Sequence, residues 1–151
     1  MAKANGSHAP ASVTLQYQLI RTTTSPDEVQ SGVKSFVANL PAFEILKLGT
    51  KENLRAYIAD YNPKKRNSVH DAILDTMQKE PERFITRNSG FVITADGIDV
   101  DDTKKVMKLK HPSIINGAQS QGEARKYLLQ QFPEESTWNL QDPPFFVRAE
   151  I

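Results

Sequence analysis

Amide, glycine and hydroxyl residues are concentrated in one segment of the sequence, HPSIINGAQSQGEARKYLL, residues 111–129. The β-branched run that ends at Ile115 predicts a buried strand, and the dipeptide Asn116-Gly117 predicts a turn after it. Ser120 and Glu123 have the S-x-x-E spacing of a capping box, which predicts a helix start. A helix N-terminus offers backbone N–H groups and the positive end of its dipole to an anion. The residues that we expect to contact a phosphate are Asn116, Gly117, Gln119 and Ser120.

The same turn also has a purely structural interpretation, in which the asparagine caps, the glycine turns the chain and the serine begins the helix. Glu123 opposes an anion site, because a carboxylate in the first helical turn already interacts with the dipole. A bound metal ion would remove that objection.

A second group of basic and amide residues lies in the segment PERFITRNSGF, residues 81–91. Asn88 and Gly90 predict a tight turn before a buried strand, and Arg87 offers a guanidinium that matches a phosphate. Solvated arginines beside a structural turn are the alternative. We expect the ligand site where the 87–90 turn meets the 116–120 turn, with Arg87 and Asn88 opposite the amides. Arg55 is a further candidate for ligand binding, although a structural salt bridge would explain it as well.

Carboxylates and lysines crowd the segment between these turns. The aspartates at 96, 99, 101 and 102 do not have the spacing of a calcium loop, and we interpret them as a polar hairpin. If Glu123 or these aspartates bound Mg²⁺, the chain would be a metal-dependent nuclease or NTPase, which is a second hypothesis. Lys104, Lys105, Lys108 and Lys110 form a basic stripe that fits nucleic acid, but protection of an exposed edge strand is the interpretation we favour.

Composition excludes several classes of protein. The chain has 151 residues, a net charge of +1 and no cysteine, so a global basic excess, disulfides and cysteine metal sites are excluded. No apolar run approaches the roughly 18 residues of a membrane span. Residues 1–11 are small and polar, and we expect a disordered leader or a remnant of expression there. A cytoplasmic location without membrane partners is therefore the expectation.

Periodicity predicts a single α/β (α+β) domain over residues 12–151, with a mixed sheet of about five or six strands and three or four flanking helices. The expected strands cover 13–19, 43–48, 91–94, 98–100, 106–109, 113–115 and 145–151. The expected helices cover 25–40, 51–61, 68–80 and 120–132. A buried strand at the chain end is typical of a fragment of a longer protein.

Four short motifs, taken in order, resemble those of the AIPR family, the abortive-infection phage-resistance proteins of bacteria. They are Asn53-Leu54-Arg55-Ala56-Tyr57; Asn67 with Ile73 and Thr76; Pro81 and Phe84 with Asn88-Ser89-Gly90-Phe91-Val92-Ile93; and Pro112-Ser113-Ile114-Ile115-Asn116-Gly117-Ala118-Gln119-Ser120. Ser89 and Ser120 replace the asparagine and threonine that the family has there, and the further C-terminal portion of the family is missing. Any activity that needs that portion would be absent.

The Asn116-to-Ser120 turn is also similar to turns of ParB and sulfiredoxin-like domains, which contact nucleotide phosphates at a helix N-terminus. The resemblances imply a phosphate-recognising domain of an antiphage protein that binds a nucleotide or a nucleic acid. They do not imply hydrolysis, and the sequence identifies no cofactor beyond a candidate nucleotide with Mg²⁺. A third hypothesis is a protein-interaction module that senses a phage component, in which the turn is only structural.

Overall fold

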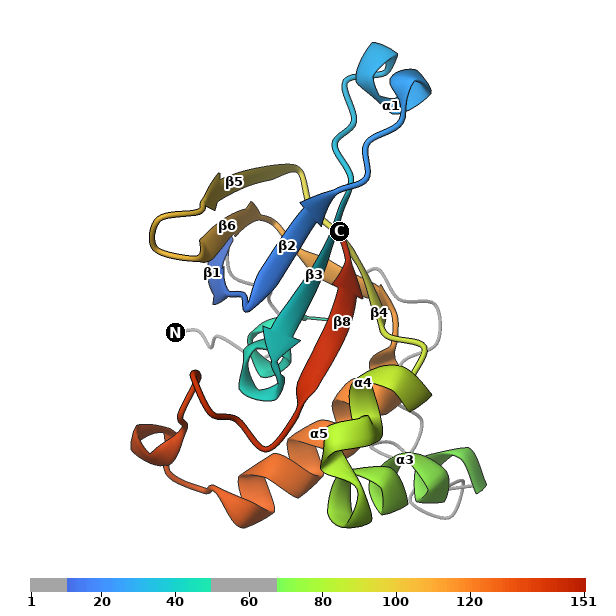
Figure 1. Ribbon diagram of the computed structural model, residues 1–151, viewed down its shortest axis with the longest axis vertical. Helices are drawn as coiled ribbons and strands as arrows, with labels where there is room; N and C mark the ends of the chain where they lie inside the picture. The colour runs from blue at the N-terminus through green and yellow to red at the C-terminus, as the bar shows by residue number, and fades with distance from the viewer. Residues whose placement is uncertain (1–10, 50–67) are drawn as a thin grey trace, which may run out of the picture.

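The structure is a computed structural model that describes residues 11–49 and 68–151, and their strands form two sheets (Figure 1). The strands are β1 (Ser12–Gln16), β2 (Leu19–Thr22), β3 (Phe36–Pro41), β4 (Phe91–Thr94), β5 (Gly97–Asp101), β6 (Val106–Lys110), β7 (Ser113–Asn116) and β8 (Phe146–Glu150). The α-helices are α1 (Pro26–Gln30), α3 (Ser68–Lys79), α4 (Phe84–Arg87) and α5 (Ala118–Gln131). Short 3₁₀ helices are η1 (Ala42–Lys47), η3 (Pro81–Arg83) and η4 (Glu135–Thr137).

The larger sheet has five strands in the order β2-β3-β8-β4-β7. Its β4 and β8 run parallel, whereas the other neighbours are antiparallel, so the sheet is mixed. The smaller sheet is antiparallel, in the order β1-β6-β5. The predicted α/β (α+β) class with a mixed sheet is confirmed. The hairpin β5–β6 pairs with β1, and this pairing creates the second sheet.

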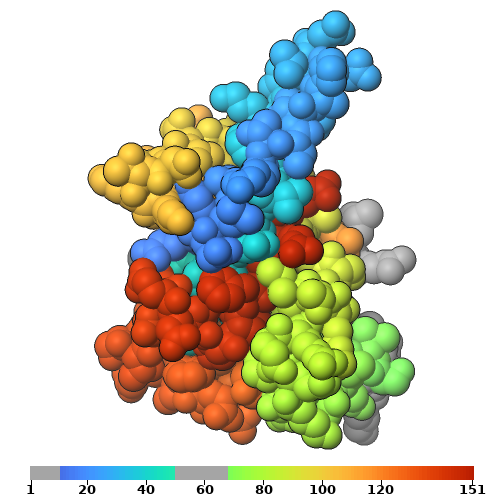
Figure 2. Space-filling view, in the orientation of Figure 1, coloured from blue at the N-terminus to red at the C-terminus, as the bar shows by residue number. Residues whose placement is uncertain are grey.

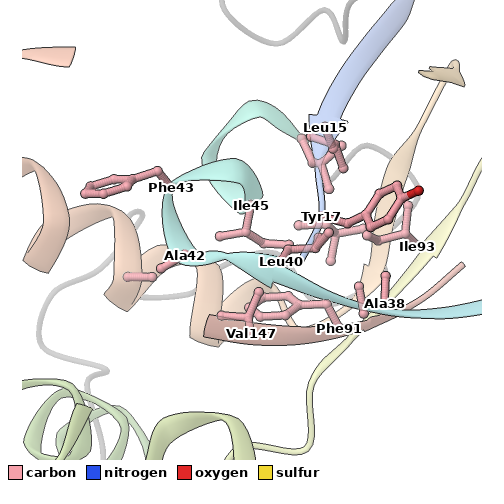
Figure 3. Packing of buried hydrophobic residues seen from close by; sticks show 14 of the residues in the cluster. Leu15, Tyr17, Ala38, Leu40, Ala42, Phe43, Ile45, Phe91, Ile93 and Val147 are labelled. Atoms are coloured by element: carbon pink, nitrogen blue, oxygen red, sulfur yellow. The ribbon is translucent and has the colours of Figure 1, made fainter. Parts of the chain in front are cut away.

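Alternating apolar residues build the core because successive strand side chains point to opposite faces. Leu15 and Tyr17 of the β1 segment are buried, as are Leu40 of β3, Phe91 of β4 and Val147 of β8. Figure 3 shows these side chains converging from both sheets. The core therefore joins the two sheets and holds both ends of β4 in fixed positions.

The segment from Ser25 to Leu48 differs from its prediction. Ser25 begins a helix with a capping box, in which Glu28 N donates to Ser25 Oγ at 3.2 Å and Ser25 N donates to Glu28 Oε1 at 2.8 Å. The helix ends at Gln30 and not at Leu40, and none of its residues is buried. Val29 is 66% exposed, and the chain turns at Gly32 with φ +74°.

The next residues follow a period of two rather than 3.6, so 36–41 is strand β3 and the predicted strand 43–48 is the 3₁₀ helix η1. The arm formed by the ends of β2 and β3 with α1 between them projects from the rest of the molecule (Figures 1 and 2).

Helix α5 and the segment after it pack against the core. Ala124 and Leu128 are buried, and Tyr127 packs against the core. Trp138 stacks on Phe43 with ring centroids 4.8 Å apart, so it anchors the loop that precedes β8.

Two predictions lie outside the described residues: the helix over 51–61, with Asn53 and Arg55, and the leader, except Ala11. Ala11 O accepts a hydrogen bond from His111 N at 2.9 Å. Within residues 11–49 and 68–151, no helix combines the length and apolar character that crossing a membrane requires.

Candidate functional site

The two turns that the sequence singles out face one cleft of about 1240 Å³. Helix α3 forms one wall with Val69 and Ile73, and the 87–90 turn forms another. The end of β7 and the first turn of α5, residues 115–120, complete the lining. The predicted meeting of the 87–90 and 116–120 turns is therefore present. Their part in binding a ligand stays a prediction.

Gly117 fixes the turn between β7 and α5. It is the N-cap of α5 and has φ +112°, a conformation that other residues rarely adopt. A Cβ atom at this position would lie 2.5 Å from Cδ1 of Phe91, which is buried beneath the turn. Glycine is thus required both for the backbone conformation and for the close approach to β4.

The start of α5 differs from the predicted capping box. No side chain caps the helix, and its first turn holds no acidic residue. Ser120 is the third helical residue, not the cap, because the left-handed Gly117 already ends the turn. Glu123 lies in the second turn and is 1% exposed, so it is not the first-turn carboxylate that opposed an anion site.

Asn88 connects the two turns. Its Nδ2 donates to Ser120 Oγ at 2.8 Å, and its Oδ1 accepts from Gly90 N at 2.9 Å. Gly90 has φ +88°, and a Cβ there would lie 2.7 Å from the backbone oxygen of Arg148 in β8. The 88–90 turn is therefore held against both α5 and the central strand β8.

His70 is a site residue that the sequence reasoning missed. It is 2% exposed in α3, and its Nε2 lies 2.7 Å from Oε1 of Gln119. Val69 of α3 is 57% exposed, whereas His70 and Met77 are the buried residues of this helix. The spacing of these two residues, i and i+7, was the available signal, because it places both on one helical face.

Arg87 lies at the rim of the cleft with an ion-pair partner. Its Nη1 contacts Oε2 of Glu80, and its side chain is 46% exposed. Arg83 also reaches Glu80, at 3.7 Å. An anion in the cleft would therefore compete with Glu80 for Arg87. Arg55, the other predicted basic ligand, lies outside the described residues.

The aspartates of the β5 region serve local contacts. Asp96 Oδ2 lies 2.9 Å from His111 Nδ1, and Asp101 Oδ1 accepts from Thr103 N at 3.1 Å. Asp102 accepts from the Tyr17 hydroxyl at 2.5 Å. Two effects raise the pKa of Tyr17 to about 12: burial is the larger, and this hydrogen bond is the next. In the part of the chain that the structure describes, no three His, Cys, Asp or Glu side chains group closely enough to hold a metal ion.

Comparison with known families yields a match over residues 51–123 to the family described as AIPR protein. This range contains all four motifs, as well as α3, the 87–90 turn and the turn at the start of α5. Searches of curated proteins and of solved structures returned no match. The resemblance of this chain to the AIPR family, the abortive-infection phage-resistance proteins of bacteria, is therefore confirmed over residues 51–123 and indicates an antiphage role.

Proposed function

We propose that the cleft binds the phosphates of a nucleotide, free or within a nucleic acid, and that this recognition serves the antiphage role. One observation carries the proposal: two turns rich in glycine and amide residues line the same cleft. One of them leads into the 14-residue helix α5, whose first turn also lines the cleft. Gln119 and Ser120, together with the backbone of the first turn of α5, hold the phosphates.

The start of α5 suits an anion in two respects. A helix dipole favours negative charge at the N-terminus by about 0.3–1 kcal/mol at exposed sites. No side-chain cap and no first-turn carboxylate of α5 uses this field. Asn116 is exposed at the end of β7 and adds an amide beside the turn. Asn88 has the different role of a positioning residue, because its contacts to Ser120 and Gly90 hold the two turns in register.

The apolar side chains of the cleft suit the rest of a nucleotide. Val69 of α3 is 57% exposed and Ile115 of β7 is 38% exposed, and both line the cleft. Ligand sites combine apolar walls with a few polar groups that orient the ligand. A base or sugar over these side chains, with phosphates at the turn, uses both kinds of surface, whereas inorganic phosphate uses only one.

A thermal-shift series with ATP, CTP, GTP and inorganic tripolyphosphate, each with and without Mg²⁺, tests the proposal. A ligand that binds only the folded chain at 100 times its Kd adds about 2.7 kcal/mol of stability. We expect one nucleotide to raise Tm more than tripolyphosphate does. Asn116→Ala should reduce that shift, and Gln130→Ala, on the exposed side of the same helix, should preserve it. Equal melting temperatures with every compound would contradict the proposal.

A further inference from the structure

A second cleft of about 990 Å³ lies at the other end of β4. The cleft of the proposed function includes Gly90, just before β4, whereas this one includes Thr94, the last β4 residue. Basic side chains reach it from separate parts of the chain. They are Lys34 before β3, Lys108 and Lys110 of β6, and His111.

The role that we predicted for the lysines of β6 does not fit the structure. We predicted that they protect an exposed edge strand, but β6 is the middle strand of its sheet, so that prediction is wrong. Lys108 and Lys110 are two residues apart, both are exposed, and they lie on the same face of the sheet. Two ammonium groups at i and i+2 on one face of a strand repel each other. An anionic partner would relieve the repulsion between these two lysines.

The carboxylates of the cleft form no ion pair with these lysines. Asp99 stands opposite Lys108 in the β5–β6 register, but Gly97 and Ser12 stand opposite Lys110. The other aspartate in the lining is Asp96, and its Oδ2 lies 2.9 Å from Nδ1 of His111. Among the described residues, neither Lys34 nor the two β6 lysines has an ion pair or a side-chain hydrogen bond. The three lysine ammonium groups are therefore not held by ion pairs within the described residues.

We propose that this cleft binds the phosphate backbone of a polynucleotide. Lysine ammonium groups are mobile point charges, which suit a run of phosphates better than the fixed geometry of one small anion. Because the whole chain has a net charge of only +1, its attraction to a polyanion has to come from such a local cluster. The inference does not depend on the first cleft, because it rests on different residues at the opposite end of β4.

The test is a salt titration of binding to a fluorescently labelled random-sequence DNA duplex, followed by anisotropy. Each phosphate contact contributes about −0.9 to the slope of log K against log salt. We expect the double variant Lys34→Gln/Lys110→Gln to bind about tenfold more weakly at low salt, with a slope smaller by about 1 to 2. The matched control is Lys104→Gln/Lys105→Gln, which removes the same charge from the turn at the other end of β6 and should match the parent chain.

Several results would overturn the inference. One is a slope and affinity in Lys34→Gln/Lys110→Gln equal to those of the parent chain, and another is no duplex binding at low salt. Competition by polyglutamate as effective as by DNA of equal charge would point to an acidic protein segment instead. Duplex binding lost in Asn116→Ala but unchanged in the lysine variant would support the first cleft and contradict this one.

Discussion

Asn88 donates a hydrogen bond to Ser120 at 2.8 Å across 32 residues of sequence, and this bond joins the turn before β4 to the first turn of α5. Because the same side chain also accepts from Gly90 N, Asn88 sets the separation of the two turns that line the cleft. Two chain segments, the 87–90 turn and α5, are thus held together at the candidate site.

Replacement of Asn88 by alanine removes both bonds. Each net hydrogen bond contributes about 0.5–1.5 kcal/mol, so Asn88→Ala should lower the free energy of unfolding by about 1–3 kcal/mol. Urea denaturation followed by Trp138 fluorescence measures the change. Ser120→Ala, which leaves the Gly90 contact in place, should cost about half as much. Equal stabilities of Asn88→Ala and the parent chain would show that Asn88 does not hold the turns.

Gly117 and Gly32 form a matched pair for testing the contact with Phe91. Both have positive φ, but a Cβ at Gly32 meets nothing within 4 Å, whereas one at Gly117 lies 2.5 Å from Phe91. Gly32→Ala should cost about 1 kcal/mol from backbone strain alone. Gly117→Ala should cost a further 1–3 kcal/mol, roughly, from overpacking. Equal losses in denaturant titrations of the two variants would contradict the close approach to Phe91.

Glu80 controls the availability of Arg87. If the arginine joins a bound phosphate, it has to leave the Glu80 carboxylate, which it contacts in the structure described here. Glu80→Gln should therefore tighten nucleotide binding, by up to about fivefold given the small worth of an exposed ion pair. Arg87→Gln should weaken binding by about tenfold or more, since charge-assisted bonds contribute roughly 1.5–3 kcal/mol. Isothermal titration calorimetry measures the nucleotide affinity of both variants. An unchanged affinity in Arg87→Gln would show that Arg87 does not contact the ligand.

The raised pKa of Tyr17 predicts that the folded chain loses stability at alkaline pH. Its ordinary pKa of 10.0 is raised to about 12 by burial and by the Asp102 hydrogen bond, so folding favours the protonated phenol. That contribution is complete below about pH 10 and is lost as the pH rises through about 12. The difference in unfolding free energy between the parent chain and Tyr17→Phe should stay constant below pH 10 and decline above it. A difference that stays flat to about pH 12 would contradict the coupling.

The sequence was most informative where local pattern and tertiary packing agree. The strand, glycine turn and helix between residues 113 and 131 follow from a β-branched run, a breaker and a 3.6-residue period, and the structure contains all three. The capping role of Ser120 was wrong because Gly117, in a left-handed conformation, already forms the N-cap. The helical prediction for residues 36–40 was wrong because Phe36 and Leu40 also have helical spacing, and pairing with both β2 and β8 selects the strand.

Contacts between distant segments could not be predicted in this way. The approach of His70 to Gln119 depends on which face α3 turns toward α5, and the apolar residues of α3 left two faces open. The central position of β6 depends on β1, which is more than 80 residues earlier in the chain. Periodicity reports which residues of one element are buried, but not which element covers them.

The most direct test of the central claim is a titration of the ¹⁵N-labelled chain with the nucleotide that gives the largest thermal shift, followed by amide chemical shifts. If the cleft binds the phosphates, the largest changes in chemical shift should occur at the amides of residues 117–120 and of Gly90. The amide chemical shift of Gln130 should not change. Changes confined to amides away from the 87–90 and 116–120 turns would place the ligand elsewhere and contradict the account.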